Sequence, residues 1–171
     1  MHDKKSILLI ISGGIAAYKA LELIRLLKKR GHLVRCILTD GGAQFITPMS
    51  VAAISEDEVY TDLWSLKNEN EMGHIRLSRE ADLVLVAPAS ADIIAKAANG
   101  LCDDLASTSL LATDKPVMMA PAMNVRMWEH PATQDNITRL HQRGITLCGP
   151  DVGDMACGEY GPGRMAEPEL I

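Results

Sequence analysis

Residues 6–19 read SILLIISGGIAAYK, and this stretch decides how the fold begins. After its first residue the run Ser6–Ile11 is continuously apolar, which is typical of a strand buried on both faces. A Ser-Gly-Gly turn follows at residues 12–14, and residues 15–30 show helical periodicity with Gly31 as a stop signal. The chain is therefore predicted to start with a strand, a glycine turn and a helix.

The turn at Ser12, Gly13 and Gly14 brings the amino end of the predicted helix to the carboxyl end of the strand. Free backbone N–H groups and the helix dipole make such a helix end a binding site for anions. The turn lacks the G-x-G-x-x-G spacing of dinucleotide sites, so a single phosphate, as on FMN, suits it better. The alternative is a plain strand-to-helix turn that binds nothing.

The same alternation of apolar runs and helical patterns continues along the chain. It favours a doubly wound parallel α/β sheet, flavodoxin-like or Rossmann-like, with residues 1–171 as a single domain. The carboxyl ends of the strands in such a sheet share one ligand crevice. Further strands are predicted at residues 33–38, 82–87, 117–120 and 145–147. Further helices are predicted at residues 43–46, 48–54, 76–80, 93–99, 102–113 and 133–143.

The composition is that of a soluble globular protein, with 47% apolar and 23% charged residues. A net charge of −5 and scattered Lys and Arg residues argue against a nucleic-acid partner. No apolar run reaches the roughly 20 residues that cross a membrane, and the N-terminus shows no signal-peptide pattern. The four cysteines have neither metal-ligand spacing nor a CxxC motif, so we expect reduced thiols, a cytoplasmic protein and no metal site.

Two further predicted strands end in small or hydroxyl residues. Thr39 follows the second predicted strand as Ser12 follows the first, so its hydroxyl is a second candidate for a phosphate. Ala89 and Ser90 follow the third predicted strand, where small side chains let a flat ring or a phosphate approach the backbone. The alternative for Thr39 and Ser90 is that each caps the helix that follows it.

Residues 121–128, PAMNVRMW, concentrate unusual side chains after the apolar run at 117–120. The amide of Asn124 can both donate and accept hydrogen bonds, and Met123 and Met127 can form apolar, adaptable walls. This position, at the end of a strand, is where an open α/β sheet places its ligand. The alternative is an ordinary helix start, with Asn124 as the cap and the methionines in the core.

His74 lies where a polar, irregular stretch at residues 55–73 meets the predicted helix at 76–80. A loop of this length in a globular domain is usually functional or mobile. The ordinary pKa of histidine suits a base that works near neutral pH. The alternative, commoner for a lone histidine, is a ring that is satisfied by its surroundings.

The glycine-rich tail at residues 151–165 is expected to lack regular structure. Cys157 lies in its middle, and a stretch of this kind can close over a ligand as a flap hinged on glycine. The alternative is a frayed terminus. A disordered tail gains nothing from Cys, Tyr and Met, so the flap is the favoured interpretation, with residues 151–166 as its extent.

Five stretches resemble motifs of the homo-oligomeric flavin-containing cysteine decarboxylases, in order and over essentially the whole chain. Residues 12–19, SGGIAAYK, are similar to the flavin phosphate turn, and residues 87–92, APASAD, resemble the second flavin loop. Residues 73–75, GHI, look like the active-site histidine motif. Residues 121–128 resemble the substrate-binding motif, and residues 156–165, ACGEYGPGRM, resemble the substrate clamp with its cysteine.

The resemblance implies FMN as cofactor and, most closely, the branch of the family that serves coenzyme A biosynthesis. The implied substrate is 4′-phosphopantothenoylcysteine and the product 4′-phosphopantetheine. In this chemistry the substrate thiol is oxidised to a thioaldehyde, the carboxylate beside it leaves as CO₂, and the resulting enethiolate is reduced with the hydride that the flavin holds. The reaction needs no external reductant.

The family's residue roles carry over by motif. His74 is expected to be the base, Cys157 the proton donor in the reduction, and Asn124 the group that binds the substrate carboxylate or amide. The expected cofactor residues are Ser12, Gly13, Gly14, Thr39, Ala89, Ser90 and Met119, and the expected substrate residues are Met123, Asn124, Met127, Ala156 and Arg164. Cys102 stands where the family pattern has a small residue, and we expect it to be a buried thiol that acts as a small hydrophobe.

The resemblance also implies a homotrimer or homododecamer with FMN at a subunit interface. Many bacterial relatives carry a second domain, a CTP-dependent phosphopantothenate–cysteine ligase. The chain is expected to be either a stand-alone decarboxylase or the first half of such a fusion, and the fusion is favoured. Four other functions stay open: decarboxylation of a peptidyl-cysteine, a non-catalytic regulatory subunit, a flavin prenyltransferase and an electron-carrying flavodoxin. Such regulatory subunits usually lack the histidine or the cysteine, whereas His74 and Cys157 are both present; neither a prenyltransferase nor a flavodoxin needs Asn124 or Cys157.

Overall fold

A parallel sheet forms the centre of the computed structural model, which describes residues 4–64 and 73–171 of the chain. Within these residues the strand order is β3-β2-β1-β4-β5-β6, and every neighbouring pair is parallel. The predicted doubly wound sheet is therefore confirmed. The strands are β1 (Ser6–Ile11), β2 (Leu33–Leu38), β3 (Val59–Tyr60), β4 (Leu83–Ala89), β5 (Val117–Pro121) and β6 (Thr146–Leu147).

Strand β1 lies at the point where the strand order reverses. It pairs with β2 on one side and with β4 on the other, so that Ile7 lies beside both Val34 and Leu83. The connections leave β1 and β4 in opposite directions across the sheet, which opens a crevice at their carboxyl ends. The turn after Ile11 and the turn after Ala89 both face this crevice.

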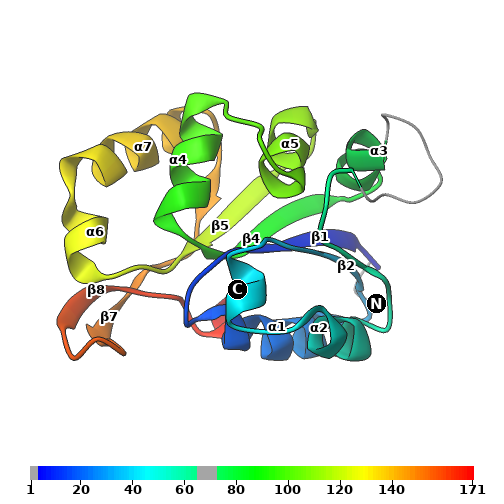
Figure 1. Cartoon of the computed structure of the whole chain (residues 1–171), viewed down its shortest axis with the longest axis horizontal. Helices are drawn as coiled ribbons and strands as arrows, with labels where there is room; N and C mark the ends of the chain where they lie inside the picture. The colour runs from blue at the N-terminus through cyan, green and yellow to red at the C-terminus, as the bar shows by residue number, and fades with distance from the viewer. Residues whose placement is uncertain (1–3, 65–72) are drawn as a thin grey trace.

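Helices cover both faces of the sheet (Figure 1). Helices α1 (Ala17–Lys29) and α2 (Pro48–Ser55) lie on one face. Helices α3 (Gly73–Arg79), α4 (Ala91–Asn99), α5 (Leu105–Ala112) and α7 (Pro131–Gln142) lie on the other. Because successive side chains of a strand point to opposite faces, Leu9 packs into the core with α1 and Ile10 into the core with α4, both without exposed surface. Burial of each such side chain contributes roughly 1.5–3 kcal/mol.

Several helices begin with a side-chain cap, as proposed for Ser90. Its hydroxyl oxygen accepts a hydrogen bond from the backbone N–H of Ile93 at 3.3 Å, at the start of α4. Asp104 and Ser107 form a capping box at the start of α5. Helix α1 differs, since no side chain of the described residues caps its amino end. The backbone N–H groups there are not satisfied by a cap, and this end faces the crevice.

A two-stranded antiparallel hairpin, formed by β7 (Asp151–Asp154) and β8 (Tyr160–Arg164), follows the last strand of the sheet. The expectation that glycines keep this tail irregular is therefore wrong. Gly163, at φ +144°, brings its backbone so close to Met123 that a Cβ atom would lie 2.2 Å from the Met123 carbonyl oxygen. Glycine thus makes the pairing and the close packing possible here, rather than preventing them.

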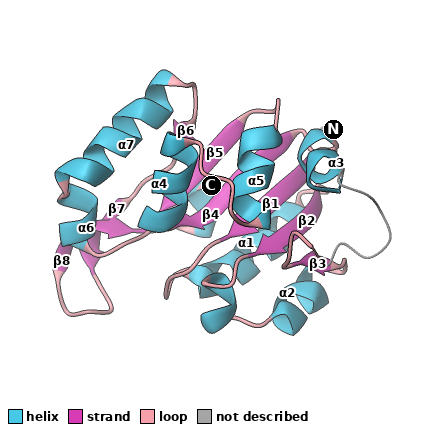
Figure 2. Cartoon of the chain, turned by 45° about the horizontal axis from the view of Figure 1, so that its top comes forward, coloured by secondary structure: helices cyan, strands magenta, loops and turns pink. Residues whose placement is uncertain are grey.

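The hairpin lies beside the short helix α6 (Val125–Glu129), at the opposite end of the molecule from α3 (Figures 1 and 2). Helix α6 follows Asn124, where the sequence offered a helix start as the alternative, whereas the sequence pattern did not indicate β3 (Val59–Tyr60). Two 3₁₀ turns, η1 (Gly42–Gln44) and η2 (Pro168–Leu170), complete the described elements. Part of the predicted irregular stretch, residues 65–72, lies outside the described residues.

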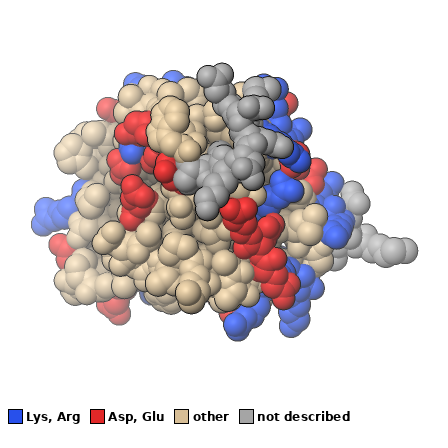
Figure 3. All heavy atoms as spheres, turned by 45° about the vertical axis from the view of Figure 1, so that its right-hand side comes forward, with Lys and Arg blue, Asp and Glu red and all other residues tan. Residues whose placement is uncertain are grey.

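Two surface features bear on earlier expectations. Cys102 is exposed, in the turn between α4 and α5, so the expectation of a buried thiol there is wrong. On the face in Figure 3, the visible Lys and Arg side chains are interspersed with Asp and Glu instead of gathering into one patch. Among the described residues, no helix has the length and apolar character to cross a membrane.

Candidate active site

The floor of the crevice is the point where β1 and β4 end together. The hydroxyl of Ser12, which is 2% exposed, donates a hydrogen bond to the carbonyl oxygen of Pro88 at 2.6 Å. The same hydroxyl accepts one from the backbone N–H of Ser90 at 2.9 Å. Both bonds run across the junction, so Ser12 fixes the two strand ends against each other and builds the floor beneath the cavity.

The turn after Ser12 packs against the turn after β2. A Cβ atom on Gly13 would lie only 3.0 Å from backbone atoms of Gly41. A larger residue at position 13 would therefore fit only if the two turns moved apart. This contact sets the course of Gly13 and Gly14 toward the uncapped start of α1. The N–H groups of Ala17 and Lys19 donate to the carbonyl oxygens of Gly14 and Ala16. An anion in the crevice would therefore use the neighbouring backbone N–H groups and the positive end of the helix dipole.

A cavity of about 560 Å³ opens above this floor. Its walls come from the start of α1, the start of α4, the turn after β5 and the hairpin. This volume lies within the range of about 300–1,000 Å³ that is usual for sites that bind small molecules and cofactors. Of the residues expected from the sequence, the cavity brings together Gly13, Gly14, Ser90, Met123, Asn124, Met127, Ala156, Cys157 and Arg164.

Asn124 has both of the roles considered for it from the sequence. Its carbonyl oxygen Oδ1 accepts a hydrogen bond from the backbone N–H of Arg126 at 2.8 Å, which caps α6. Its amide nitrogen Nδ2 points the other way, toward the hairpin, and lies 3.5 Å from Sγ of Cys157. The cap fixes which end of the amide faces the cavity, so the donor is presented there.

Glu159 is a site residue that the sequence reading missed. Its carboxylate accepts a hydrogen bond from Nδ2 of Asn124, and its Oε2 lies 3.7 Å from Sγ of Cys157 as a partner for the thiol. Asn124, Cys157 and Glu159 therefore form one cluster, of which Asn124 and Cys157 line the cavity. The signal that could have identified Glu159 is its place in the clamp motif, as the one acid of residues 156–165, two positions after the cysteine.

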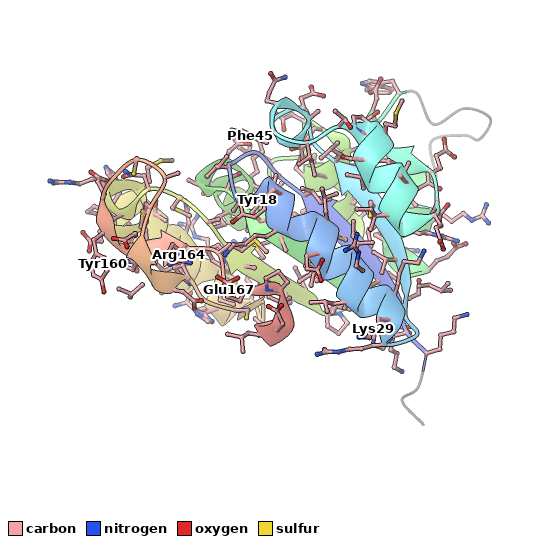
Figure 4. The ribbon with its side chains drawn as sticks, turned by 90° about the horizontal axis from the view of Figure 1, so that it is seen from below. Tyr18, Lys29, Phe45, Tyr160, Arg164 and Glu167 are labelled. Carbon is pink, nitrogen blue, oxygen red and sulfur yellow. The ribbon has the colours of Figure 1, made fainter. Side chains whose placement is uncertain are left out.

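The base of the hairpin is held by a second cluster. The backbone N–H of Met123 donates to the carbonyl oxygen of Gly163 at 3.0 Å. Lys19, a largely buried residue of α1, donates to the carboxylate of Glu167 at 2.9 Å and to the carbonyl oxygen of Met165 at 3.1 Å. The hydrogen bond and charge of Lys19 lower the pKa of Glu167. Figure 4 shows Glu167 next to Arg164, with Tyr160 farther out along the hairpin.

Besides Ser12, which lies beneath the cavity, four expected residues lie away from the cavity wall. Ala89 and Met119 are completely buried, within β4 and β5. Thr39 accepts a hydrogen bond from the backbone N–H of Gly42 at 3.0 Å and stabilises the turn after β2. His74 is the second residue of α3, at a helix start as expected, but α3 and the hairpin are at opposite ends of the molecule (Figures 1 and 2). One copy of the chain does not bring His74 to Cys157.

The cluster of Asn124, Cys157 and Glu159 combines an amide donor, a thiol and a carboxylate. Such groups can bind a carboxylate or an amide and can hold a proton close to a reacting atom. Within the described part of the chain, no three His, Cys, Asp or Glu side chains gather as metal ligands. The amide, thiol and carboxylate of the cluster themselves suit acid–base and binding functions.

Comparisons with known proteins agree with the fold. A family model described as "Flavoprotein" matches residues 1–171. The coenzyme A biosynthesis bifunctional protein CoaBC of Haemophilus influenzae is 50% identical over 167 residues, which are 98% of this chain and 42% of that protein. The chain thus spans less than half the length of this curated relative.

Two solved structures are also similar. A cysteine-to-serine mutant of PPC decarboxylase, complexed with pantothenoylaminoethenethiol, superposes with a TM-score of 0.89 at 38% identity, over 98% of this chain and 94% of that one. The FMN-binding protein AtHal3 superposes with a TM-score of 0.86 at 38% identity, over 98% of this chain and 92% of that one.

Proposed function

The chain belongs to the flavoprotein family, and on that premise we propose that it binds FMN and decarboxylates 4′-phosphopantothenoylcysteine to 4′-phosphopantetheine in coenzyme A biosynthesis. The observation that carries the proposal is the placement of the Asn124 amide 3.5 Å from the Cys157 thiol, on the wall of the cavity at the switch point. The similarity to CoaBC and to PPC decarboxylase supports the choice of substrate.

The residues of the cavity fit FMN. The uncapped end of α1, with Gly13 and Gly14 leading into it, would hold the phosphate through backbone N–H groups. Ser90 and Ala91 would border the ring system, because their small side chains leave room for a flat group beside the backbone. When bound, the flavin supplies the oxidation of the substrate thiol to a thioaldehyde and the hydride for the later reduction.

The chain's own residues would bind the substrate and move its protons. Asn124 would hold the carboxylate of the cysteine moiety, while Met123 and Met127 would exclude water from the enethiolate left after CO₂ departs. Cys157 would deliver the proton to carbon during the reduction. The compound in the complex of PPC decarboxylase carries an ethenethiol group, which matches the group that this reaction would form from cysteine.

We propose that the hairpin, with residues 151–166, is the substrate clamp. Its strands are paired and its base is held by Lys19 and Met123, whereas Ala156, Cys157 and Gly158 at the tip are exposed. Movement of the tip alone would close the cavity over a substrate.

His74 would act as the base in a site completed by a second copy of the chain. The placement of α3 and the hairpin at opposite ends of one copy supports this arrangement (Figures 1 and 2). Three side chains at the cavity also remain exposed and apolar, namely Ile15 at 60%, Tyr18 at 59% and Met127 at 49%, as expected of a surface that another copy covers. The expected assembly is a homotrimer or homododecamer.

For residues 1–171 we propose the decarboxylase step alone. The relative that is named bifunctional is longer than this chain. We expect the rest of such a protein to contain the fused ligase that uses CTP. The cytoplasm, where thiols stay reduced, is the expected compartment.

The test is a spectrum followed by an assay. The purified protein, reconstituted with FMN where needed, should show oxidised-flavin absorbance and release CO₂ from 4′-phosphopantothenoylcysteine, faster than from a peptide that ends in cysteine. The His74→Asn variant should keep the flavin and lose turnover. A protein that cannot take up FMN, or that prefers the peptide, would refute the proposed activity.

A further inference from the structure

The N–H groups of the Asn124 amide are both engaged among the described residues. Its Oδ1 accepts from the backbone of Arg126. Its Nδ2 carries two hydrogen atoms and has two partners, the carboxylate of Glu159 and the Sγ of Cys157. A substrate carboxylate that uses this amide must therefore displace one of these two partners.

Glu159 is the partner of Asn124 that carries the same functional group as the substrate, a carboxylate. A carboxylate of the cysteine moiety and the carboxylate of Glu159 would compete for the same N–H donor. Both are negatively charged, so holding them side by side would add like-charge repulsion to the lost hydrogen bond. Displacement of Cys157 instead would leave the two carboxylates in contact.

The hairpin lets the Glu159 side chain move without unpairing the strands. The carbonyl oxygen of Glu159 accepts a hydrogen bond from the backbone N–H of Met155 at 2.8 Å, which closes the end of the hairpin. The N–H of Gly158 donates to the carbonyl oxygen of Met155 at 2.9 Å and completes the turn. The side chain of Glu159 is half-buried and next to exposed residues, so it can turn to solvent while its backbone stays fixed.

We propose that Glu159 is a positioning and specificity residue whose carboxylate holds Asn124 and Cys157 together until a substrate carboxylate takes its place. Exchange of one carboxylate for the other releases the Cys157 thiol from Glu159 when an acid substrate has arrived. After CO₂ leaves, Asn124 has lost its ligand, and Glu159 returns. A product without a carboxylate binds without this exchange. The inference rests on the proposed function, in which Asn124 binds the substrate carboxylate.

The test compares two ligands that differ by the carboxylate. For the FMN-loaded wild type and for Glu159→Gln and Glu159→Ala, KM and kcat are measured with 4′-phosphopantothenoylcysteine, and the inhibition constant Ki is measured with 4′-phosphopantetheine. Loss of the competing charge-assisted hydrogen bond should lower KM about tenfold in Glu159→Ala and about threefold in Glu159→Gln, while Ki changes less than about twofold. The kcat of Glu159→Ala should fall below that of the wild type, because the Asn124 amide and the Cys157 thiol lose their common partner. The kcat of Glu159→Gln should stay closer to the wild-type value.

Asp154→Asn is the matched control for charge. Asp154 is an exposed acid of the same hairpin that lines the cavity, and its side chain is not one of the hydrogen-bond partners of Asn124 among the described residues. Its neutralisation should affect both phosphorylated ligands equally and leave the ratio of KM to Ki unchanged. If the wild type is active and the ratio of KM to Ki is unchanged in Glu159→Ala, the inference about Glu159 is overturned while the proposed function stands. A wild type that releases no CO₂ would overturn the proposed function and the inference together.

Discussion

Two walls of the site are built in different ways. One wall is the floor at the junction of β1 and β4, and the other is the side formed by the hairpin. At the junction of β1 and β4, Ser12 and Ala89 are buried, and the hydroxyl of Ser12 bonds to backbone groups. At the hairpin tip, Cys157 is exposed, and its contacts with Asn124 and Glu159 run between side chains. Core packing therefore sets the wall proposed for the cofactor, and a few exposed polar contacts set the wall proposed for the substrate.

This difference separates two requirements of a flavin-dependent decarboxylase. A cofactor that stays bound through many turnovers benefits from a rigid site, whereas a substrate must enter and leave. The hairpin combines both properties, because its base is tied to α1 by Lys19 and to Met123, and its tip carries the reactive thiol. Substitutions in the two walls should accordingly give different kinds of defect.

The largest effect is expected from Cys157→Ser. Loss of the thiol proton donor should reduce turnover by about a hundredfold or more, because general acids typically contribute about 10²–10⁴ to a rate. Flavin binding and Tm should hardly change, since Cys157 is exposed and away from the floor. Mixing with substrate in a stopped-flow spectrometer should bleach the oxidised flavin and leave it reduced, with the decarboxylated enethiol trapped.

Cys102→Ser serves as the control, because Cys102 is also exposed but lies in the turn between α4 and α5. It should turn over like the wild type. Normal turnover in Cys157→Ser, or loss of flavin from it, would contradict the division between the walls.

The next largest effect is expected where the hairpin packs against the turn after β5, at Gly163 and Met123. Gly163→Ala would place a methyl group 2.2 Å from the Met123 carbonyl oxygen at φ +144°, so β8 must move away from the turn after β5. We expect KM to rise about tenfold and unfolding free energy to fall by roughly 1–3 kcal/mol from backbone strain, with FMN affinity within about twofold. Enzyme kinetics, thermal unfolding and flavin titration measure these quantities.

Gly158→Ala is the matched control in the same hairpin. Gly158 also has a positive φ, +81°, but an added Cβ atom would meet nothing within 4 Å. Its effect on KM should be clearly smaller. Equal effects of the two substitutions would show that the contact between Gly163 and Met123 does not seat the hairpin.

A smaller effect, on the other wall, is expected from Ser12→Ala. The variant would remove the partner of the partly buried Ser90 N–H and one of the two hydrogen bonds to the Pro88 carbonyl oxygen, which would keep the 3.3 Å bond from the backbone N–H of Ser12. Such a loss costs about 1–3 kcal/mol, or roughly 2–4 °C in Tm for each kcal/mol in a chain of this size. Flavin affinity should weaken, while KM at saturating FMN should stay within about twofold of the wild type.

Ser109→Ala controls for removal of a buried hydroxyl. Ser109 is also completely buried, and its hydroxyl has no hydrogen-bond partner among the described residues. Its loss should leave Tm unchanged or slightly raised. If Ser12→Ala were equally harmless, the floor would not depend on the bonds between β1 and β4.

The same contrast explains how much could be predicted from the sequence. The buried wall is encoded locally: Ser6–Ile11 and Leu33–Leu38 were predicted with their observed bounds, since strands buried on both faces are continuous apolar runs. The hairpin was missed because its glycines carry no apolar pattern and its pairing depends on contact with Met123. Glu159 was missed because its partner Asn124 lies 35 positions away in the chain.

His74 shows a third kind of limit. Its place at a helix start was predicted from the local pattern, and that prediction is confirmed. Its distance from Cys157 depends on where α3 and the hairpin pack, which no local pattern encodes. A motif can therefore identify a candidate base correctly while leaving open which copy of the chain uses it.

The smallest effect on stability near neutral pH is expected from the cysteine thiols. Because Cys36 is buried and Cys157 is exposed, the thiols also measure directly how the two walls differ. Burial, with a further contribution from the charge of Asp57, raises the pKa of Cys36 in β2 from 9.0 to about 12, against an opposing hydrogen bond with Ser55. Below pH 9 the thiol keeps its proton in both folded and unfolded chains, so it adds no pH dependence. Between pH 9 and 12 the unfolded chain loses this proton first, and stability should fall by up to about 1.4 kcal/mol per pH unit.

Urea unfolding from pH 8 to 11 should show this decline, and Cys36→Ala should lose the part of the slope that depends on the thiol. Labelling with iodoacetamide at pH 8 should modify the exposed Cys102 and Cys157 in the folded protein and Cys36 only after unfolding. Rapid labelling of Cys36 in the folded state would mean that the sheet opens as readily as the hairpin tip. The two walls would then not differ in rigidity, and the separation of cofactor and substrate defects expected above would fail with it.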